Sequence, residues 1–219
     1  MHRPILTCLF SDVFGVGSWP LKKEYEGNDY SIFGFHMNAT SSYAGGDYAS
    51  MIFENGAHLL TKTSSSHLFP MVSFSFVVSL YLWNRGDILL LKMMDSTGKS
   101  YPQIKISTDE IELRLSDTSH FKARYTLSFK LNLWYQIAVT VGSEVKFYVD
   151  SASGLLENNG DTVTSGCESF TSPNVSLAIG TSSTKFSYAL RDARLFKGVL
   201  QSSYLVPLRR WANKGEWYS

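Results

Sequence analysis

The sequence predicts an all-β fold, a sandwich of two antiparallel sheets. Apolar and polar residues alternate in short runs, most clearly over residues 73–83, 134–141 and 145–149, and this period of two is typical of strands with one buried face. Turn-forming residues separate the runs at intervals of about 8–12 residues, which favours a sandwich or a barrel. The chain shows no internal repeat, no heptad pattern and no long amphipathic helix. We therefore expect one layered β domain.

The clearest element is a β-hairpin. Residues 134–141 and 145–149 alternate in polarity, and only Gly142, Ser143 and Glu144 separate them. A short turn with a glycine between two alternating runs favours a hairpin. The side chains expected on its core face are those of Ile137, Val139 and Val141.

Other alternating runs predict strands on both sides of this hairpin. In residues 73–83, aromatic and aliphatic side chains face one way and serines the other, so we expect one core face and one polar sheet surface. The remaining predicted strands cover residues 51–53, 88–94, 103–107, 111–115, 125–130, 175–179 and 192–196. Turn-forming residues predict loops, with short strands in the first, over residues 22–50, 61–70 and 150–173, and a short helix is expected within 202–211.

The hairpin and the last predicted strand resemble a known family. The hairpin begins at Trp134 with the pattern W-x-x-(apolar)-A-V-T, and Asp192, Arg194 and Phe196 follow the pattern D-x-R-(apolar)-(aromatic). Both patterns are similar to the late hairpin and final strand of laminin G-like and pentraxin-like domains. Residues 19–21 and 73–83 are similar to earlier strands of the same family. The resemblance covers about residues 15–206.

This resemblance implies a two-sheet antiparallel jelly roll of the concanavalin A-like group, with residues 1–219 forming one laminin G-like domain. It also implies an extracellular or cell-surface module of a larger receptor-like or adhesive protein. Because one fold hosts many unrelated activities, the ligand has to be argued from particular residues.

The composition excludes several functional classes. The 20 basic and 19 acidic residues give a net charge of +1, which argues against a nucleic-acid-binding protein. No stretch approaches the roughly 18 apolar residues of a membrane-spanning helix, so we expect no membrane insertion. The apolar run near the N-terminus is short and interrupted by Pro4, so it does not predict a signal peptide.

Two cysteines and two sequons bear on the cellular setting. Cys8 and Cys167 match no metal or redox spacing, so they form either a disulfide that pins the N-terminal segment to a late loop or two unpaired thiols. The sequons at Asn38 and Asn174 predict N-glycosylation and favour an extracellular protein.

One predicted strand carries acidic residues that an enzyme could use. Glu110, Glu112 and Arg114 share one face of this strand. Glycosidases use two carboxylates, and jelly-roll β-glucanases carry theirs on one strand in patterns close to E-x-D-x-E. Here the pattern is E-x-E-x-R, without the central Asp and with a cation at the third position. We therefore expect a solvated strand face with cross-strand ion pairs, and ligand binding is its alternative use.

The resemblance also implies a structural calcium ion. Many domains of this superfamily bind calcium between the last strand and the N-terminal region, and this implies Asp192 as a ligand, with Asp29, Asn28 and the carbonyl oxygen of Gly45 as further candidates. Hard oxygen ligands suit Ca²⁺. The alternative for Asp192 is a salt bridge to a neighbouring arginine or a turn cap.

Further residues suit recognition rather than catalysis. Tyr43 and Tyr48 lie in loop-like contexts, where exposed rings stack on sugars or anchor partner proteins. Residues 85–87 form an Arg-Gly-Asp tripeptide of the integrin-binding type, although a tight turn alone also favours such residues.

We therefore expect a non-catalytic extracellular module that binds a glycan or a partner protein. Loops on a rigid sandwich are the first place for such a site, and the strand face with Glu112 is the second. Two alternatives stay open, a jelly-roll glycoside hydrolase that uses Glu110 or Glu112 and a structural module that self-associates.

Overall fold

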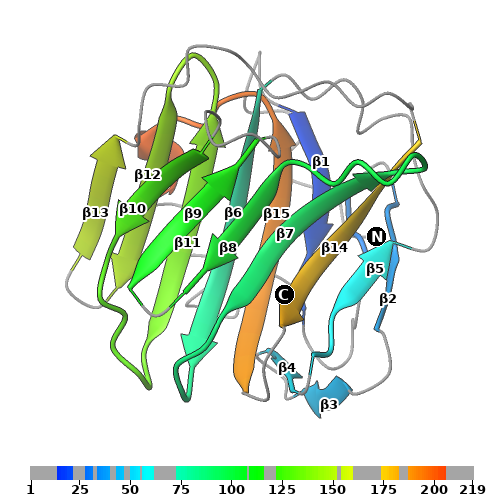
Figure 1. Cartoon of the computed structure of the whole chain (residues 1–219), viewed down its shortest axis with the longest axis horizontal. Coiled ribbons are helices and arrows are strands. Elements are labelled where there is room, and N and C mark those ends of the chain that lie inside the picture. Colours follow the sequence, from blue (N-terminus) through cyan, green and yellow to red (C-terminus); the bar gives the residue numbers. More distant parts are fainter. Residues whose placement is uncertain are drawn as a thin grey trace.

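The computed structural model describes most of the chain as a sandwich of two antiparallel sheets, one in front of the other in Figure 1. The described residues are 14–21, 28–31, 34–39, 43–46, 50–54, 56–61, 73–107, 109–115, 122–151, 154–159, 174–182 and 187–205. This architecture confirms the predicted all-β jelly-roll sandwich. Among these residues, no helix has the length and apolar character needed to span a membrane.

One sheet has eight strands. Their bounds are β1 Phe14–Trp19, β3 Tyr43–Gly46, β4 Met51–Phe53, β6 Phe74–Leu82, β11 Trp134–Val141, β12 Val145–Ser151, β13 Gly154–Asn159 and β15 Tyr188–Lys197. The order is β13-β12-β11-β6-β15-β4-β3, and β1 is an additional strand that also pairs with β15. The predicted hairpin is confirmed as β11 and β12. Their pairing runs from Val141 opposite Val145 to Gln136 opposite Asp150.

The other sheet has seven strands and is in front in Figure 1. Their bounds are β2 Met37–Ala39, β5 Leu59–Thr61, β7 Ile88–Asp95, β8 Gln103–Ile106, β9 Glu110–Arg114, β10 Lys122–Thr126 and β14 Val175–Ser182. The order is β10-β9-β8-β7-β14-β5-β2. The two sheets face each other across a core filled by alternate residues of strands such as β6, β9 and β12.

Tyr188 links the two sheets through this core. Its ring stacks on Phe53 at a centroid distance of 5.3 Å, and its hydroxyl donates to the carbonyl oxygen of Gly180 in β14. Burial raises the pKa of the Tyr188 phenol, so the hydroxyl keeps the proton that it donates. Gly180 has a φ of 79°, and a Cβ there would lie 3.2 Å from the Tyr188 hydroxyl, so the position requires glycine.

The outward face of the eight-stranded sheet is covered at its centre. Ser75 Oγ donates to the carbonyl oxygen of Gly198 and accepts from the N–H of Leu200, both at 2.8 Å. This brings residues 198–205, with a helical turn at 202–205, over the sheet. A second apolar cluster forms where these residues meet the sheet, from Val77, Ala138, Tyr148, Phe196, Leu200 and Leu205. The predicted alternation of residues 73–83 is confirmed, but the predicted polar sheet surface is wrong because the chain folds back over it.

Several strand predictions differ from the structure, most clearly in β10, β13 and β15. β10 begins at Lys122 rather than at residue 125, because its residues pair one to one with β9. β13 lies in a segment predicted as a loop, and it is an edge strand defined by its hydrogen bonds to β12 rather than by an apolar pattern. β15 begins before residue 192, and a bulge between Arg191 and Arg194 interrupts its pairing with β6.

Candidate functional site

The predicted strand face of Glu110, Glu112 and Arg114 forms the candidate site. In β9, Ile111 and Leu113 are fully buried in the core, so the three charged side chains are directed outward, as predicted. β8 and β10 flank β9 and direct alternate residues to the same side. We name this surface the β8–β10 face, and it comprises Gln103, Lys105, Glu110, Glu112, Arg114, Lys122 and Arg124.

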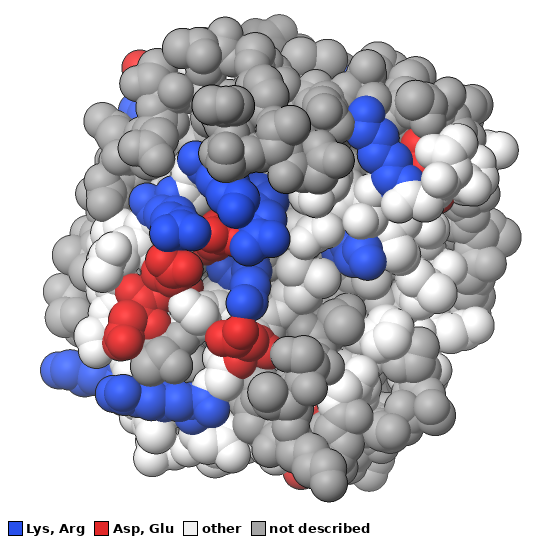
Figure 2. Space-filling model, in the orientation of Figure 1, with Lys and Arg blue, Asp and Glu red and all other residues white. Residues whose placement is uncertain are grey.

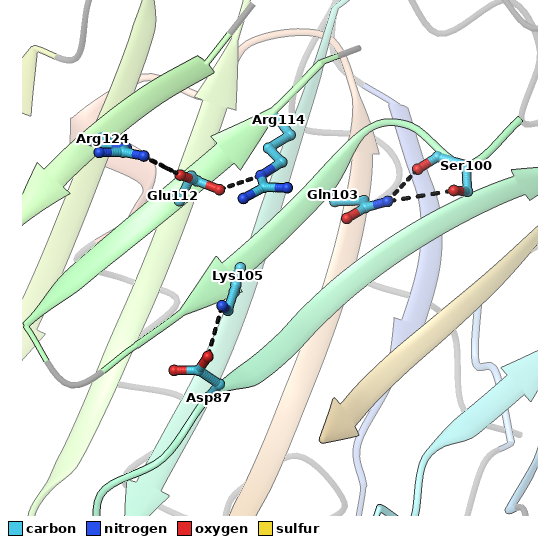
Figure 3. A network of polar contacts seen from close by, with 7 residues as sticks. All are labelled: Asp87, Ser100, Gln103, Lys105, Glu112, Arg114 and Arg124. Carbon is cyan, nitrogen blue, oxygen red and sulfur yellow. Dashed lines mark hydrogen bonds and ion pairs between the residues drawn. The ribbon is translucent and has the colours of Figure 1, made fainter. Parts of the chain in front are cut away.

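Glu112 lies at the centre of this face (Figure 3) and is only 3% exposed. Arg124 Nε donates to its Oε2 at 3.0 Å, and Arg124 Nη2 forms an ion pair with the same oxygen at 2.9 Å. Arg114 Nε donates to its Oε1. Burial alone raises the pKa of the Glu112 carboxyl, but the hydrogen bonds and charges of the two arginines more than offset this, and the pKa lies below its ordinary value. Glu112 is therefore ionised at neutral pH.

The strand register places further polar side chains beside this trio. Lys105 lies directly across from Glu112, while Gln103 and Lys122 lie across from Arg114 on its two sides. Directly opposite residues have Cβ atoms about 4.5–5.5 Å apart, so these side chains are neighbours.

Two members of the face are tied to residues outside it (Figure 3). Lys105 Nζ forms an ion pair with the carboxylate of Asp87 at 2.7 Å. Gln103 Nε2 donates to the carbonyl oxygen of Ser100 at 2.6 Å. Asp87 is the acid of the predicted Arg-Gly-Asp turn, and in the structure its carboxylate is paired with a strand residue of the same chain.

Cations outnumber carboxylates on the β8–β10 face, where Lys105, Lys122, Arg114 and Arg124 accompany Glu110 and Glu112. Figure 2 shows this gathering of charged side chains on the visible side of the seven-stranded sheet. The side chains of Arg114 and Arg124 are 38% and 55% exposed. The face is therefore a solvent-accessible basic surface built around one buried acid.

This arrangement suits binding better than acid catalysis. A glycosidase needs a carboxylic acid that stays protonated at its working pH, which requires a raised pKa. The pKa of Glu112 is lowered instead, and arginines occupy both of its oxygens. Glu112 is therefore a structural anion that organises two cations.

Asp29 holds an N-terminal loop together. Its Oδ1 accepts from the N–H of Ser18 at 2.7 Å and of Ser31 at 2.8 Å, and its Oδ2 accepts from Ser31 Oγ and the N–H of Phe35, both at 2.7 Å. Asn28 beside it is exposed. These hydrogen bonds explain the burial of the Asp29 carboxylate without a metal ion.

Asp192 lies in β15, which pairs with β1. Its N–H donates to the carbonyl oxygen of Pro20 at 3.0 Å, and its φ of 51° places it in the bulge of β15. The backbone of Ser18 in β1 bonds to the Asp29 side chain and to the N–H of Tyr30. Within the described ranges, no three His, Cys, Asp or Glu residues gather around one point. Calcium binding by Asp192, Asp29, Asn28 and Gly45 therefore stays a prediction.

The remaining predicted residues are placed as follows. Asn38 in β2 and Asn174 before β14 are exposed, and their glycosylation stays a prediction. Gly45 and Tyr43 belong to β3, at the end of the eight-stranded sheet. The positions Tyr48, Cys8 and Cys167 lie outside the described residues, so the disulfide is also untested.

One feature was missed by the sequence analysis, a group of apolar side chains at one end of the sandwich. Trp83, Leu131 and Leu133 are 40%, 36% and 36% exposed, and a 2.8 Å hydrogen bond from Asn132 N to Leu82 O holds their loops together. We name this group, with Tyr81 and Trp134 beside it, the apolar tip. The signal in the sequence was a tryptophan at the end of one predicted strand and another at the start of its partner.

Comparison with solved structures shows similarity to botulinum neurotoxin domains. The receptor-binding domain of mosaic serotype C/D superposes with a TM-score of 0.69 at 11% identity, over 90% of this chain and 50% of that one. The serotype D ligand-binding domain in complex with N-acetylneuraminic acid gives 0.64 at 10% identity, over 90% and 50%. The DC binding domain in complex with rat synaptotagmin II gives 0.63 at 12% identity, over 90% and 51%.

These similarities concern the fold alone, because the identities are low and the chain spans about half the length of the neurotoxin domains. No protein-family model and no curated protein matches the chain. The laminin G-like assignment therefore stays a prediction. The chain has the β-sandwich fold of these binding domains, and its function has to be argued from its own residues.

Proposed function

We propose that this chain is a non-catalytic recognition module that binds a glycan through the β8–β10 face. The observation that carries the proposal is the ionised Glu112, which holds Arg114 and Arg124 side by side with parts of both side chains open to solvent. Binding groups on paired strands are held more precisely than groups on loops. A partner protein is the alternative ligand.

The structural neighbours support this class of function. Serotype D and DC domains were solved with N-acetylneuraminic acid, with SialylT and with rat synaptotagmin II, and cell entry of type C depends on two ganglioside molecules. These neighbours are binding domains, which favours recognition over catalysis. Because only the fold is shared, they support the class of function and not a particular ligand.

The proposal includes an extracellular setting within a larger adhesive or receptor-like protein. The exposed sequon residues Asn38 and Asn174 agree with it. Asn38 lies on β2, at the opposite edge of the seven-stranded sheet from β10, so a glycan there would leave the β8–β10 face open. We propose calcium only as a structural ion, because the β8–β10 face offers mainly cations and needs no metal to bind a glycan.

A glycan array with purified protein, run in calcium and in chelator, tests this function. We expect binding in both conditions and its loss in the double variant R114Q/R124Q. A blank array together with binding to a protein partner would replace the glycan by a protein. Glycan hydrolysis that disappears in E112Q would show that the module is an enzyme.

A further inference from the structure

We infer that the β8–β10 face recognises an anionic group, the carboxylate or sulfate of an acidic saccharide, and that Glu112 is the residue that positions the arginines for it. This inference rests on the proposed function and names the ligand class of that same site. Four features of the face support it in turn.

The first feature is a set of spare donors. Arg114 uses its Nε for Glu112, and among the described residues its two terminal amino groups make no hydrogen bond or ion pair. Arg124 uses Nε and Nη2, and its Nη1 is likewise without a partner in the described part of the chain. Guanidinium N–H groups in a planar fork match the two oxygens of a carboxylate or sulfate.

The second feature is that the two guanidinium groups are fixed before any ligand arrives. Both bond to one carboxylate that is 3% exposed and belongs to a central position of β9. A long side chain that is already ordered loses less conformational entropy on binding, which favours affinity. Glu112 thus acts through the arginines and does not need to touch the ligand.

The third feature is the surroundings of Arg114. Lys122 lies across from it on one side, so a further cation can reach the same group. Gln103 lies across from it on the other side and donates its amide to Ser100. Of the described carboxylates near this face, Asp87 pairs with Lys105 and Glu110 lies across from Thr126. Among the described residues, the charge left open around Arg114 is therefore positive.

The fourth feature is the kind of side chain on the face. Its seven members are charged or carry an amide, and none is aromatic. Stacking on a neutral sugar ring needs an aromatic surface, and the exposed tryptophan of the apolar tip lies at the end of the other sheet. Recognition on the β8–β10 face therefore depends on the acid group of the saccharide.

Replacing Glu112 tests the inference, because a positioning role and a simple charge effect predict opposite changes in affinity for an anionic ligand. Replacing Glu112 by Gln removes a negative charge, and if net charge alone governed binding, an anionic ligand would bind more tightly. If Glu112 positions the arginines, the same substitution loosens them and weakens binding in spite of the gained positive charge.

The experiment measures dissociation constants by calorimetry for paired saccharides. The pairs are sialyllactose with lactose, and a heparin octasaccharide with its desulfated form, so that carboxylate and sulfate are distinguished. The proteins are the wild type, R114K, E112Q and the control R85Q, in which Arg85 is an exposed arginine outside the face. Thermal unfolding checks that each variant is folded.

We expect the acidic member of at least one pair to bind more than tenfold tighter than its neutral partner. We expect R114K and E112Q each to weaken that binding about tenfold and R85Q to leave it unchanged. Tighter binding by E112Q would overturn the positioning role. Equal binding of acidic and neutral members would overturn the inference and leave the proposed function standing, while no binding of any saccharide would overturn both.

Discussion

The outward faces of the two sheets begin from the same sequence pattern and end in opposite environments. On the seven-stranded sheet, Glu112 and its neighbours form an open charged surface. On the eight-stranded sheet, Ser75 and Ser79 are 0% and 3% exposed, and residues 198–205 cover the strands. A polar residue on the outward side of a strand thus either faces solvent or is buried. It is buried where another part of the chain supplies its hydrogen bonds.

The difference shows how each face contributes to the molecule. The covered face adds a second apolar cluster outside the main core and so contributes to stability. The open face holds its buried charge by ion pairs whose cations reach solvent, so it contributes little to stability and keeps donors available.

The largest expected effect comes from residues 198–205, which we call the cover because they lie over the eight-stranded sheet. Leu200 belongs to residues 198–205 and is 1% exposed, so Leu200→Ala should lower the free energy of unfolding by about 2–4 kcal/mol through lost burial and a cavity. The control Leu131→Ala, at a position 36% exposed, should change it by less than about 0.5 kcal/mol. Urea unfolding measures both, and equal losses would mean that the cover is not part of the folded core.

A smaller effect is expected at Ser75, which ties the cover to the sheet. Ser75→Ala removes a donor to Gly198 and an acceptor from Leu200, and should cost about 1–3 kcal/mol because both backbone groups lose their partner. Ser176→Ala, which removes one 3.4 Å bond to Met94, is the control and should cost less. A Ser75 variant as stable as the control would show that water satisfies these groups.

On the charged face, the expected effect depends on pH. The pKa of Glu112 is lowered in the folded state, so its stabilisation is fully present above its ordinary value of 4.5 and is lost as the pH falls through the folded-state value. The free energy of unfolding of the wild type should exceed that of Glu112→Gln by about 1 kcal/mol at neutral pH. This difference should disappear in acid. Chemical unfolding between pH 7 and pH 3 measures it, and a constant gap would mean that the carboxylate charge is not the cause.

The smallest effect is expected for the Lys105–Asp87 ion pair, whose side chains are 38% and 42% exposed. Lys105→Gln should change the free energy of unfolding by less than about 0.5 kcal/mol, because solvent screens an exposed pair. A loss above 1 kcal/mol, measured in the same urea experiment, would show that the open face is more tightly coupled than its exposure indicates.

The sequence predicted the part of the fold that local alternation determines. The hairpin and the outward direction of Glu112 follow from a period of two, which needs no knowledge of the rest of the chain. The same alternation predicted the serine side of β6, but not that residues 198–205 would cover it, because that contact joins positions more than 120 apart in sequence.

The candidate site was predictable only in part for the same reason. Arg114 shares a strand with Glu112 and was included, whereas Arg124 was missed because β10 was placed three residues too late. The apolar tip was missed because only the pairing of β6 with β11 brings the loops of Trp83 and Leu131 to the same end of the sheet. Residues that one strand brings together can be predicted from a pattern, and residues that pairing brings together need the register.

The position of β15 has a consequence for the synthesis of the protein. This last strand lies between β6 on one side and β1 and β4 on the other. A ribosome adds roughly 5–20 residues per second, so β1 waits on the order of ten seconds or more for its partner. During that time the edges of β1, β4 and β6 are unpaired and open to association with other chains. Nascent chains of this protein should therefore depend on chaperones until β15 has left the ribosome, and truncation before β15 should yield aggregates rather than a smaller domain.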